Sequence, residues 1–184
     1  MYKDASELMS QCKEQNKRIW QIAVENEMKL TSSSYEDILS RFDDRLEIMF
    51  HSAQKALNAK QATKGGLIDG VAKTQYDYSK KENISGRYIN YVMSLAYSCS
   101  EVNASMGKIC ASPTAGSCGI VPAVLLGLSQ AKNISREKTL EGLITASAVG
   151  AIYTKNATVA GADGGCQAEC GVARSMAAAA AAYM

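Results

Sequence analysis

The amino-acid sequence predicts an all-α, multi-helix domain with glycine-rich loops between the helices, and three observations support this. Apolar residues recur at helical spacing over long segments of the chain. Alanine, the residue with the best helix propensity, is abundant, above all near the end of the chain. The hairpin dipeptide Asn-Gly does not occur, and strand signals are few. A length of 184 residues matches one domain with a core of its own.

The first third of the chain contains two predicted helices. The first is expected over residues 5–29, where apolar residues fall on one face, and a run of threonine and serine ends it. The second is expected over residues 35–59, after a cap formed either by Ser33, in a capping box with Glu36, or by Ser34. Its apolar stripe consists of Ile38, Phe42, Leu46, Met49 and Ala53.

Glycine-rich loops separate the later helices. Helices are expected over residues 87–108, 123–131, 136–153 and 167–184, with loops over 64–70, 112–119 and 156–165. Pro122 suits a first helical turn, because its missing N–H group has no helical partner there. Ser135 is a good N-cap, and Glu137 supports the same helix start.

Charge is unevenly distributed along the chain. The 20 Lys and Arg residues nearly balance the 18 Asp and Glu residues, and a net charge of +2 provides no strong field for nucleic acid. Residues 104–184 carry few of these charges but most of the 14 glycines. We therefore divide the domain into charged N-terminal helices over residues 1–63 and a glycine- and alanine-rich core segment over residues 64–184.

The cysteine and histidine content indicates the cellular compartment and argues against several kinds of active site. Six cysteines without a secretory signal indicate a reducing compartment, and we expect the protein to be cytoplasmic. No stretch approaches 18 consecutive apolar residues, so no membrane span is expected. His51 is the only histidine and is interpreted as a surface residue, which argues against a Ser-His-Asp hydrolase or a His-rich metal site. No lysine stands in a convincing phosphate loop for pyridoxal phosphate.

The segment from Gly164 to Gly171 reads Gly-Gly-Cys-Gln-Ala-Glu-Cys-Gly and runs into a series of alanines. Cys166 lies on a glycine-flanked turn at a predicted helix start, which leaves room for a metal cluster and favours a thiolate. A buried free cysteine is the alternative interpretation. Cys170 follows four residues later, but a single pair lacks the second half that a zinc site requires, and we interpret Cys170 as a core residue.

A second segment, Ser112–Gly119, reads Ser-Pro-Thr-Ala-Gly-Ser-Cys-Gly and lies directly before a predicted helix. Its hydroxyl and backbone N–H groups at a helix start are typical of a place that holds a carboxylate. An ordinary turn that leads into a helix is the alternative.

Together the two segments resemble the α subunit, or catalytic domain, of bacterial iron–sulfur L-serine dehydratases. The resemblance is strongest over residues 101–184, fainter over 64–100, and limited to general helical character over 1–60. Three positions depart from the family's pattern: Asp69, Asp163 and Arg174.

The resemblance implies a lyase of amino acid metabolism and gluconeogenesis. Such an enzyme uses a [4Fe–4S] cluster as a Lewis acid to eliminate water from L-serine, giving pyruvate and ammonia. Cys166 matches one cluster ligand, and the other two belong to a later segment that this chain does not contain. We therefore expect an inactive fragment without the cluster. No catalytic base is identified, and the expected substrate-binding residues are Thr114, Gly116, Ser117 and Asn156.

The resemblance also implies L-serine as substrate and a β subunit, further copies of the chain, or both, as partners. L-cysteine desulfidation by similar chemistry is the alternative activity. A non-catalytic helical subunit that only binds a partner is the alternative from another class. The remaining cysteines are interpreted as packing residues: Cys12, Cys99, Cys110 and Cys118.

Overall fold

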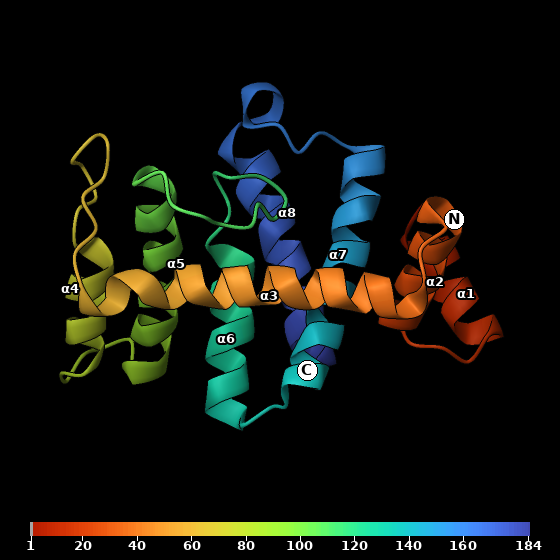
Figure 1. Cartoon of the computed structure of the whole chain (residues 1–184), viewed down its shortest axis with the longest axis horizontal. Coiled ribbons are helices and arrows are strands. Elements are labelled where there is room, and N and C mark those ends of the chain that lie inside the picture. Colours follow the sequence, from red (N-terminus) through yellow and green to blue (C-terminus); the bar gives the residue numbers. More distant parts are fainter. Residues whose placement is uncertain (1) are drawn as a thin grey trace.

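The computed structural model describes residues 2–184, and within that range the chain forms eight helices and no strand (Figure 1). The all-α prediction is confirmed. The helices are α1 (Ala5–Glu14), α2 (Ile19–Thr31), α3 (Tyr35–Asn58), α4 (Val71–Ser79), α5 (Arg87–Ala104), α6 (Ile120–Lys132), α7 (Arg136–Asn156) and α8 (Gly161–Tyr183). Across residues 2–184, no helix is long and apolar enough to cross a membrane.

Helix α3 organises the domain, because it runs across the other helices and packs against α5, α6 and α7 (Figure 1). Its predicted apolar stripe faces inward, and Leu46 and Met49 are both buried. Ser34, not Ser33, is the N-cap: the Ser34 hydroxyl accepts a hydrogen bond from the Asp37 backbone N–H at 3.1 Å, and the Asp37 side chain accepts from the Ser34 N–H. Such a capping box satisfies two N–H groups that the helix start leaves free.

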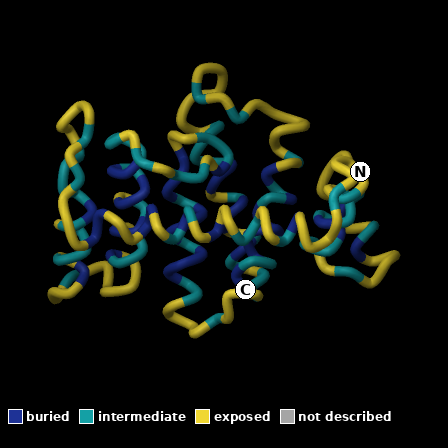
Figure 2. The backbone as a smooth tube through the Cα atoms, viewed as in Figure 1, coloured by how far each residue is buried: buried dark blue, intermediate teal, exposed yellow. Residues whose placement is uncertain are grey.

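The main core lies where α3, α6, α7 and α8 meet. Figure 2 shows the buried segments gathered in the middle of the molecule, and the exposed segments along the outer side of α3 and in the loops at the edges. The alanine-rich helix α8 contributes small side chains, so α6 and α7 approach it closely. The buried residues of this core are Leu46, Met49, Val121, Leu125, Leu143, Ala146, Val172, Met176, Ala177 and Ala180.

The prediction of one helix over residues 5–29 is wrong, because the chain breaks between α1 and α2. Asn16 adopts a left-handed conformation with φ of 51° there, and the Lys17 N–H donates to the Cys12 carbonyl at 3.0 Å. Asparagine tolerates this conformation better than most residues. Residues 15–18, between the two helices, are polar and have no apolar side chain to bury. The chain can therefore break there, and each helix packs separately.

Helix α4 was missed by the sequence pattern, and two ends of later helices are shifted by four or more residues. The helix predicted to end near residue 108 stops at Ala104, because Met106 has φ of 61° and the Gly107 N–H donates to the Val102 carbonyl at 2.8 Å. The last helix begins at Gly161, not at residue 167, and kinks at Gly165.

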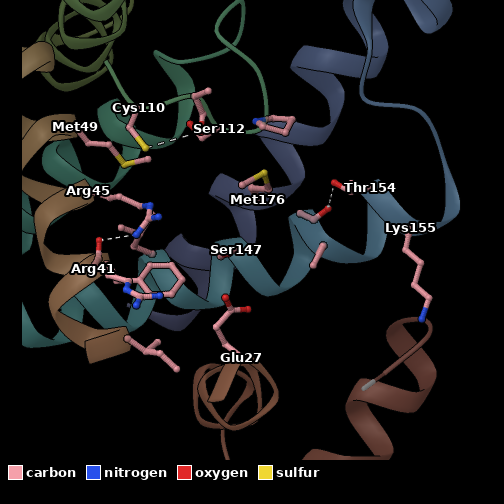
Figure 3. A pocket seen from close by; sticks show the side chains of 17 residues that line it. Glu27, Arg41, Arg45, Met49, Cys110, Ser112, Ser147, Thr154, Lys155 and Met176 are labelled. Carbon is pink, nitrogen blue, oxygen red and sulfur yellow. Dashed lines mark hydrogen bonds between the residues drawn. The ribbon is translucent and has the colours of Figure 1, made fainter. Parts of the chain in front are cut away.

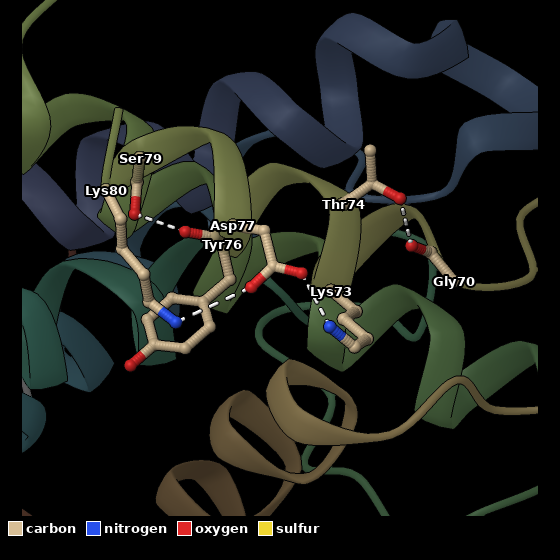
Figure 4. Close-up of polar contacts among 7 residues, drawn as sticks. All are labelled: Gly70, Lys73, Thr74, Tyr76, Asp77, Ser79 and Lys80. Carbon is tan, nitrogen blue, oxygen red and sulfur yellow. Dashed lines mark hydrogen bonds and ion pairs between the residues drawn. The ribbon is translucent and has the colours of Figure 1, made fainter. Parts of the chain in front are cut away.

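Helix α4 carries exposed polar contacts (Figure 4). Asp77 forms ion pairs with Lys73 of the same helix and with Lys80, the residue that caps its C-terminal end. The Lys80 ammonium lies 3.7 Å from the centre of the Tyr76 ring. Exposed pairs of this kind contribute little stability, so the packing of α4 against α5 holds it in place.

Candidate functional site

The loop from Ser112 to Gly119 connects α5 to α6 and is closed by its own polar groups. The Ser117 hydroxyl donates to the Ser112 carbonyl at 3.3 Å and lies 3.2 Å from the Thr114 hydroxyl. Ser117 is buried, so its side chain holds the loop rather than reaching outward. The backbone N–H groups of Ala115, Gly116 and Ser117 donate no hydrogen bond within residues 2–184. This turn therefore presents free donors directly before the start of α6.

Glu169 on α8 joins this loop to the Cys166 segment. The Thr114 hydroxyl donates to the Glu169 carboxylate at 2.7 Å, across 55 positions of sequence. A Cβ atom at Gly116 would lie 3.1 Å from both Glu169 oxygens, and one at Gly161 would lie 2.7 Å from Oε2. The carboxylate is thus held between two glycine backbones that leave it just enough space. Glu169 was not among the predicted site residues, although it belongs to the motif that contains Cys166.

Cys166 lies on the first helical turn after the kink of α8. Gly165 has φ of 68° and ψ of −169°, a conformation open essentially to glycine alone. Cys166 is exposed, and its thiol donates to the Cys170 sulfur at 3.4 Å. The hydrogen bond with Cys166 and partial burial raise the pKa of Cys170. Cys170 is only half-buried and faces Cys166, so its interpretation as a core residue is corrected.

Asn156 does not join the loop. Its side-chain amide donates to the Lys3 and Ile152 carbonyls, each at 2.8 Å, at the C-terminal end of α7. Thr114, Gly116 and Ser117 are therefore brought together in one loop, and Glu169 places the Cys166 turn beside them. Asn156 instead ties α7 to the N-terminal segment.

Comparison with known proteins identifies the family of this chain. The family described as serine dehydratase alpha chain matches residues 14–184. The chain belongs to this family. It is 42% identical to the L-serine dehydratase alpha chain of Peptoniphilus asaccharolyticus, over 98% of this chain and 62% of that protein.

Two further relatives show the same pattern. The probable L-serine dehydratase alpha chain of Bacillus subtilis is 38% identical, over 98% of this chain and 60% of the relative. L-serine dehydratase 1 of Escherichia coli is 32% identical, over 97% of this chain and 40% of the relative. This member of the serine dehydratase alpha chain family therefore spans less than two thirds of the relatives that it matches.

The other cysteines of this family member are packing residues, as predicted for Cys99 and Cys118. Both are buried, and the Cys118 thiol donates to the Cys99 carbonyl at 3.9 Å. Burial raises the pKa of Cys99 to about 12 and that of Cys118 to about 11. These thiols stay protonated at neutral pH, which suits a core and not a metal site.

The donor set does not complete an iron–sulfur site. Cys166 and Cys170 are the only adjacent thiols at the candidate site, and residues 2–184 contain no group of three or more His, Cys, Asp or Glu side chains arranged to hold a metal. A [4Fe–4S] cluster is held by three or four thiolates in most proteins. The residues described therefore fit part of such a site at most.

Proposed function

We propose that the protein deaminates L-serine and that this chain forms part of its catalytic subunit. Elimination removes the α proton and the β hydroxyl group as water. The aminoacrylate that remains becomes an imine, and water hydrolyses it to pyruvate and ammonia. Membership of the serine dehydratase alpha chain family carries this proposal. All relatives named above are serine dehydratases, so L-cysteine desulfidation is not proposed.

The site offers two features that match the two charges of serine. Free N–H groups of the 115–117 turn attract the substrate carboxylate, because they precede the start of α6. The Glu169 carboxylate attracts the substrate ammonium, while it also accepts from Thr114. In this proposal Glu169 and the turn orient serine as a zwitterion, with its hydroxyl group directed at the Cys166 side.

Cys166 is proposed as one ligand of a [4Fe–4S] cluster, for which the family resemblance implies two further cysteine ligands. When bound, such a cluster would supply a Lewis acid for the serine hydroxyl group. The "alpha chain" in the names of two relatives supports a separate β chain as a partner.

The proposal is tested on the full-length protein, purified without oxygen, reconstituted with iron and sulfide, and supplied with its β chain. Pyruvate formation from L-serine is the expected result. Absence of pyruvate from a preparation with a full cluster content would overturn the assignment.

Variants of the same full-length protein separate the roles of the residues. Cys166→Ser should remove the cluster and the activity, whereas Cys12→Ala, a thiol in α1, should change neither. Glu169→Gln keeps an acceptor for Thr114 but loses the charge, so KM for L-serine should rise about tenfold or more. Unchanged KM and kcat would remove Glu169 from the substrate site.

A further inference from the structure

A cavity of about 800 Å³ lies beside the candidate functional site. Helices α2, α3 and α7 surround it, together with Met176 of α8 and the segment from Cys110 to Pro113 (Figure 3). Neither Thr114, Cys166 nor Glu169 lines it. The cavity is therefore a separate space, although its wall ends one residue before Thr114.

Positive charge predominates in this cavity. Arg41 and Arg45 reach it from one face of α3 (Figure 3). Lys155 of α7 lines its edge, and the Lys155 ammonium points outward and donates to the Tyr2 carbonyl at 3.5 Å. Glu27 of α2 is the one carboxylate that lines it. Within residues 2–184, none of the three cations forms an ion pair, unlike Arg136, which pairs with Asp43 and Glu47 nearby on α3.

Arg41 and Arg45 stand four positions apart on α3, on the same face of the helix. Arg45 donates from Nη1 to the Arg41 backbone carbonyl at 2.8 Å, so its guanidinium lies back along α3 toward Arg41. That contact occupies one of its five N–H donors. The remaining donors of both guanidinium groups face solvent or the cavity, and planar guanidinium groups suit carboxylate oxygens.

Ser112 provides a second, independent sign of a missing ligand. The residue is 4% exposed, lines the cavity, and its hydroxyl group has no hydrogen-bond partner within residues 2–184. Buried hydroxyl groups nearly always have a partner, because leaving one unpaired is costly. A ligand with an oxygen acceptor near Ser112 would supply that partner.

Most of the remaining wall is apolar, and Ser147 and Thr154 of α7 are its further polar residues. Phe42 and Met49 from α3, Leu143 from α7 and Met176 from α8 line the space between the charged groups. Methionine side chains adapt to ligands of different shape. The cavity is also far larger than a molecule such as serine needs, since pockets for drug-sized ligands have volumes of about 300–1,000 Å³.

We propose that this cavity binds a small organic carboxylate with an apolar body. The carboxylate lies between the two arginines and Ser112 and accepts from the Ser112 hydroxyl group, and the body lies against the two methionines. An occupant contacts Ser112 and Pro113, directly before Thr114, and therefore stabilises one conformation of the 112–119 loop. This inference does not depend on the proposed function, since it concerns another space.

Binding is tested with 4-phenylbutyrate and its neutral amide, 4-phenylbutanamide, by titration calorimetry on the 184-residue chain. Trp20, the only tryptophan, packs in a cluster with Ile38 and Phe42, which both line the cavity, and its fluorescence provides a second signal. The carboxylate is expected to bind in a saturable way and about tenfold more tightly than the amide. Equal affinity for the two probes, or no binding of the carboxylate, overturns the proposal.

Four variants localise the binding. The double variant Arg41→Gln, Arg45→Gln should weaken 4-phenylbutyrate about tenfold. Glu27→Gln should tighten it, because a repelling charge is removed. Ser112→Ala should weaken it by a smaller factor. Arg87→Gln, an exposed arginine outside this cavity, is the matched control and should leave it unchanged.

Glu27, Arg41, Arg45 and Arg87 are exposed and Ser112 is buried, and circular dichroism checks that each variant folds. If the double variant did not fold, the opposite effects of Glu27→Gln and Ser112→Ala on the affinity for 4-phenylbutyrate would still test the proposal. Affinity that is the same in the wild type, the Glu27 variant and the Ser112 variant overturns the proposal.

Discussion

At the scale of single residues, burial separates one reactive thiol from the others. Cys166 is the one exposed cysteine in the part of the chain that the structure describes, whereas Cys99 and Cys118 are buried. The thiolate, not the thiol, is the nucleophile and the metal ligand. The exposure of Cys166 therefore suits a ligand position, and the buried pair suits the core.

Iodoacetamide at pH 8 should label the exposed Cys166 faster than the buried Cys99 and Cys118. A pKa of about 11 leaves Cys118 with roughly one thiolate in a thousand at pH 8, and Cys99 with fewer. Peptide mass spectrometry should find Cys166 modified first and the buried pair modified only after unfolding. Modification of Cys118 as fast as Cys166 in the folded chain would contradict the burial described here.

Burial also affects the charge of Glu101. It is fully buried on α5, and neither carboxylate oxygen has a hydrogen-bond partner within residues 2–184. Burial raises the pKa of Glu101 above 4.5, the nearby Asp69 adds to the rise, and the amides of Gly70, Val71 and Ala72 at the start of α4 oppose it. The side chain therefore faces the start of α4, and a helix start favours the charged form of a carboxylate. Its burial in the core disfavours that charged form.

Glu101→Gln should flatten the dependence of stability on pH. The folded wild type holds the proton more tightly than the unfolded chain, so its free energy of unfolding falls as pH rises from about 4.5 through the raised pKa. Glutamine does not titrate, so the variant should gain stability relative to the wild type between pH 4.5 and pH 8. Urea unfolding at several pH values measures this. A difference that does not change with pH would show that Glu101 has an ordinary pKa.

At the scale of the helices, the kink in α8 decides where Cys166 lies. The helix begins at Gly161, turns at Gly165 and then continues without a break to Tyr183. Because the kink stands one residue before Cys166, it exposes the thiol at a new helical turn. It also leaves Glu169, one turn later, facing the 112–119 loop.

Two glycine substitutions in α8 should have opposite effects on stability. Gly165→Ala places a Cβ atom on a residue with φ of 68°, which should cost about 1–3 kcal/mol. Gly171→Ala is the matched control, because its Cβ atom would meet nothing within 4 Å inside a regular helix, and it should gain about 0.5–1 kcal/mol. Thermal unfolding compares the two. Stabilisation by both would argue against the kink.

At the scale of the whole molecule, the chain spans only part of its relatives. It covers 62% of the Peptoniphilus alpha chain and 60% of the Bacillus one. The all-α fold is nevertheless closed around a buried core that α3, α6, α7 and α8 share. These 184 residues can therefore fold whether or not they bind a cluster.

The 184-residue chain should hold no intact [4Fe–4S] cluster and show no activity, because its candidate site offers two adjacent thiols. Anaerobic reconstitution should give no stoichiometric iron and sulfide and no broad visible absorbance. A longer chain with the two further cysteines that the family resemblance implies should gain both, and Cys166→Ser in that chain should remove them. A stoichiometric, oxygen-sensitive cluster on the 184-residue chain would instead make Cys170 a ligand.

Local sequence by itself determined most helices, several of their ends and the place of the 112–119 loop. Helical periodicity and caps depend on residues three or four positions apart. They can therefore be recognised in the sequence without knowledge of the tertiary structure. Ser135 shows this, since its hydroxyl group accepts from the Lys138 N–H at 3.2 Å as an N-cap should. The break at Asn16 and helix α4 were missed, because both depend on how short segments pack against the rest of the chain.

Only the tertiary structure decided which functional groups meet. The contact between Thr114 and Glu169 joins residues 55 positions apart, and it exists because α6 packs against α8. The place of Asn156 at the end of α7 brings its amide to the Lys3 carbonyl and not to the loop. The packing of α2, α3 and α7 forms the cavity that Arg41 and Arg45 line. Side-chain encounters at this range depend on the packing of whole helices, and that information lies in no single segment of the sequence.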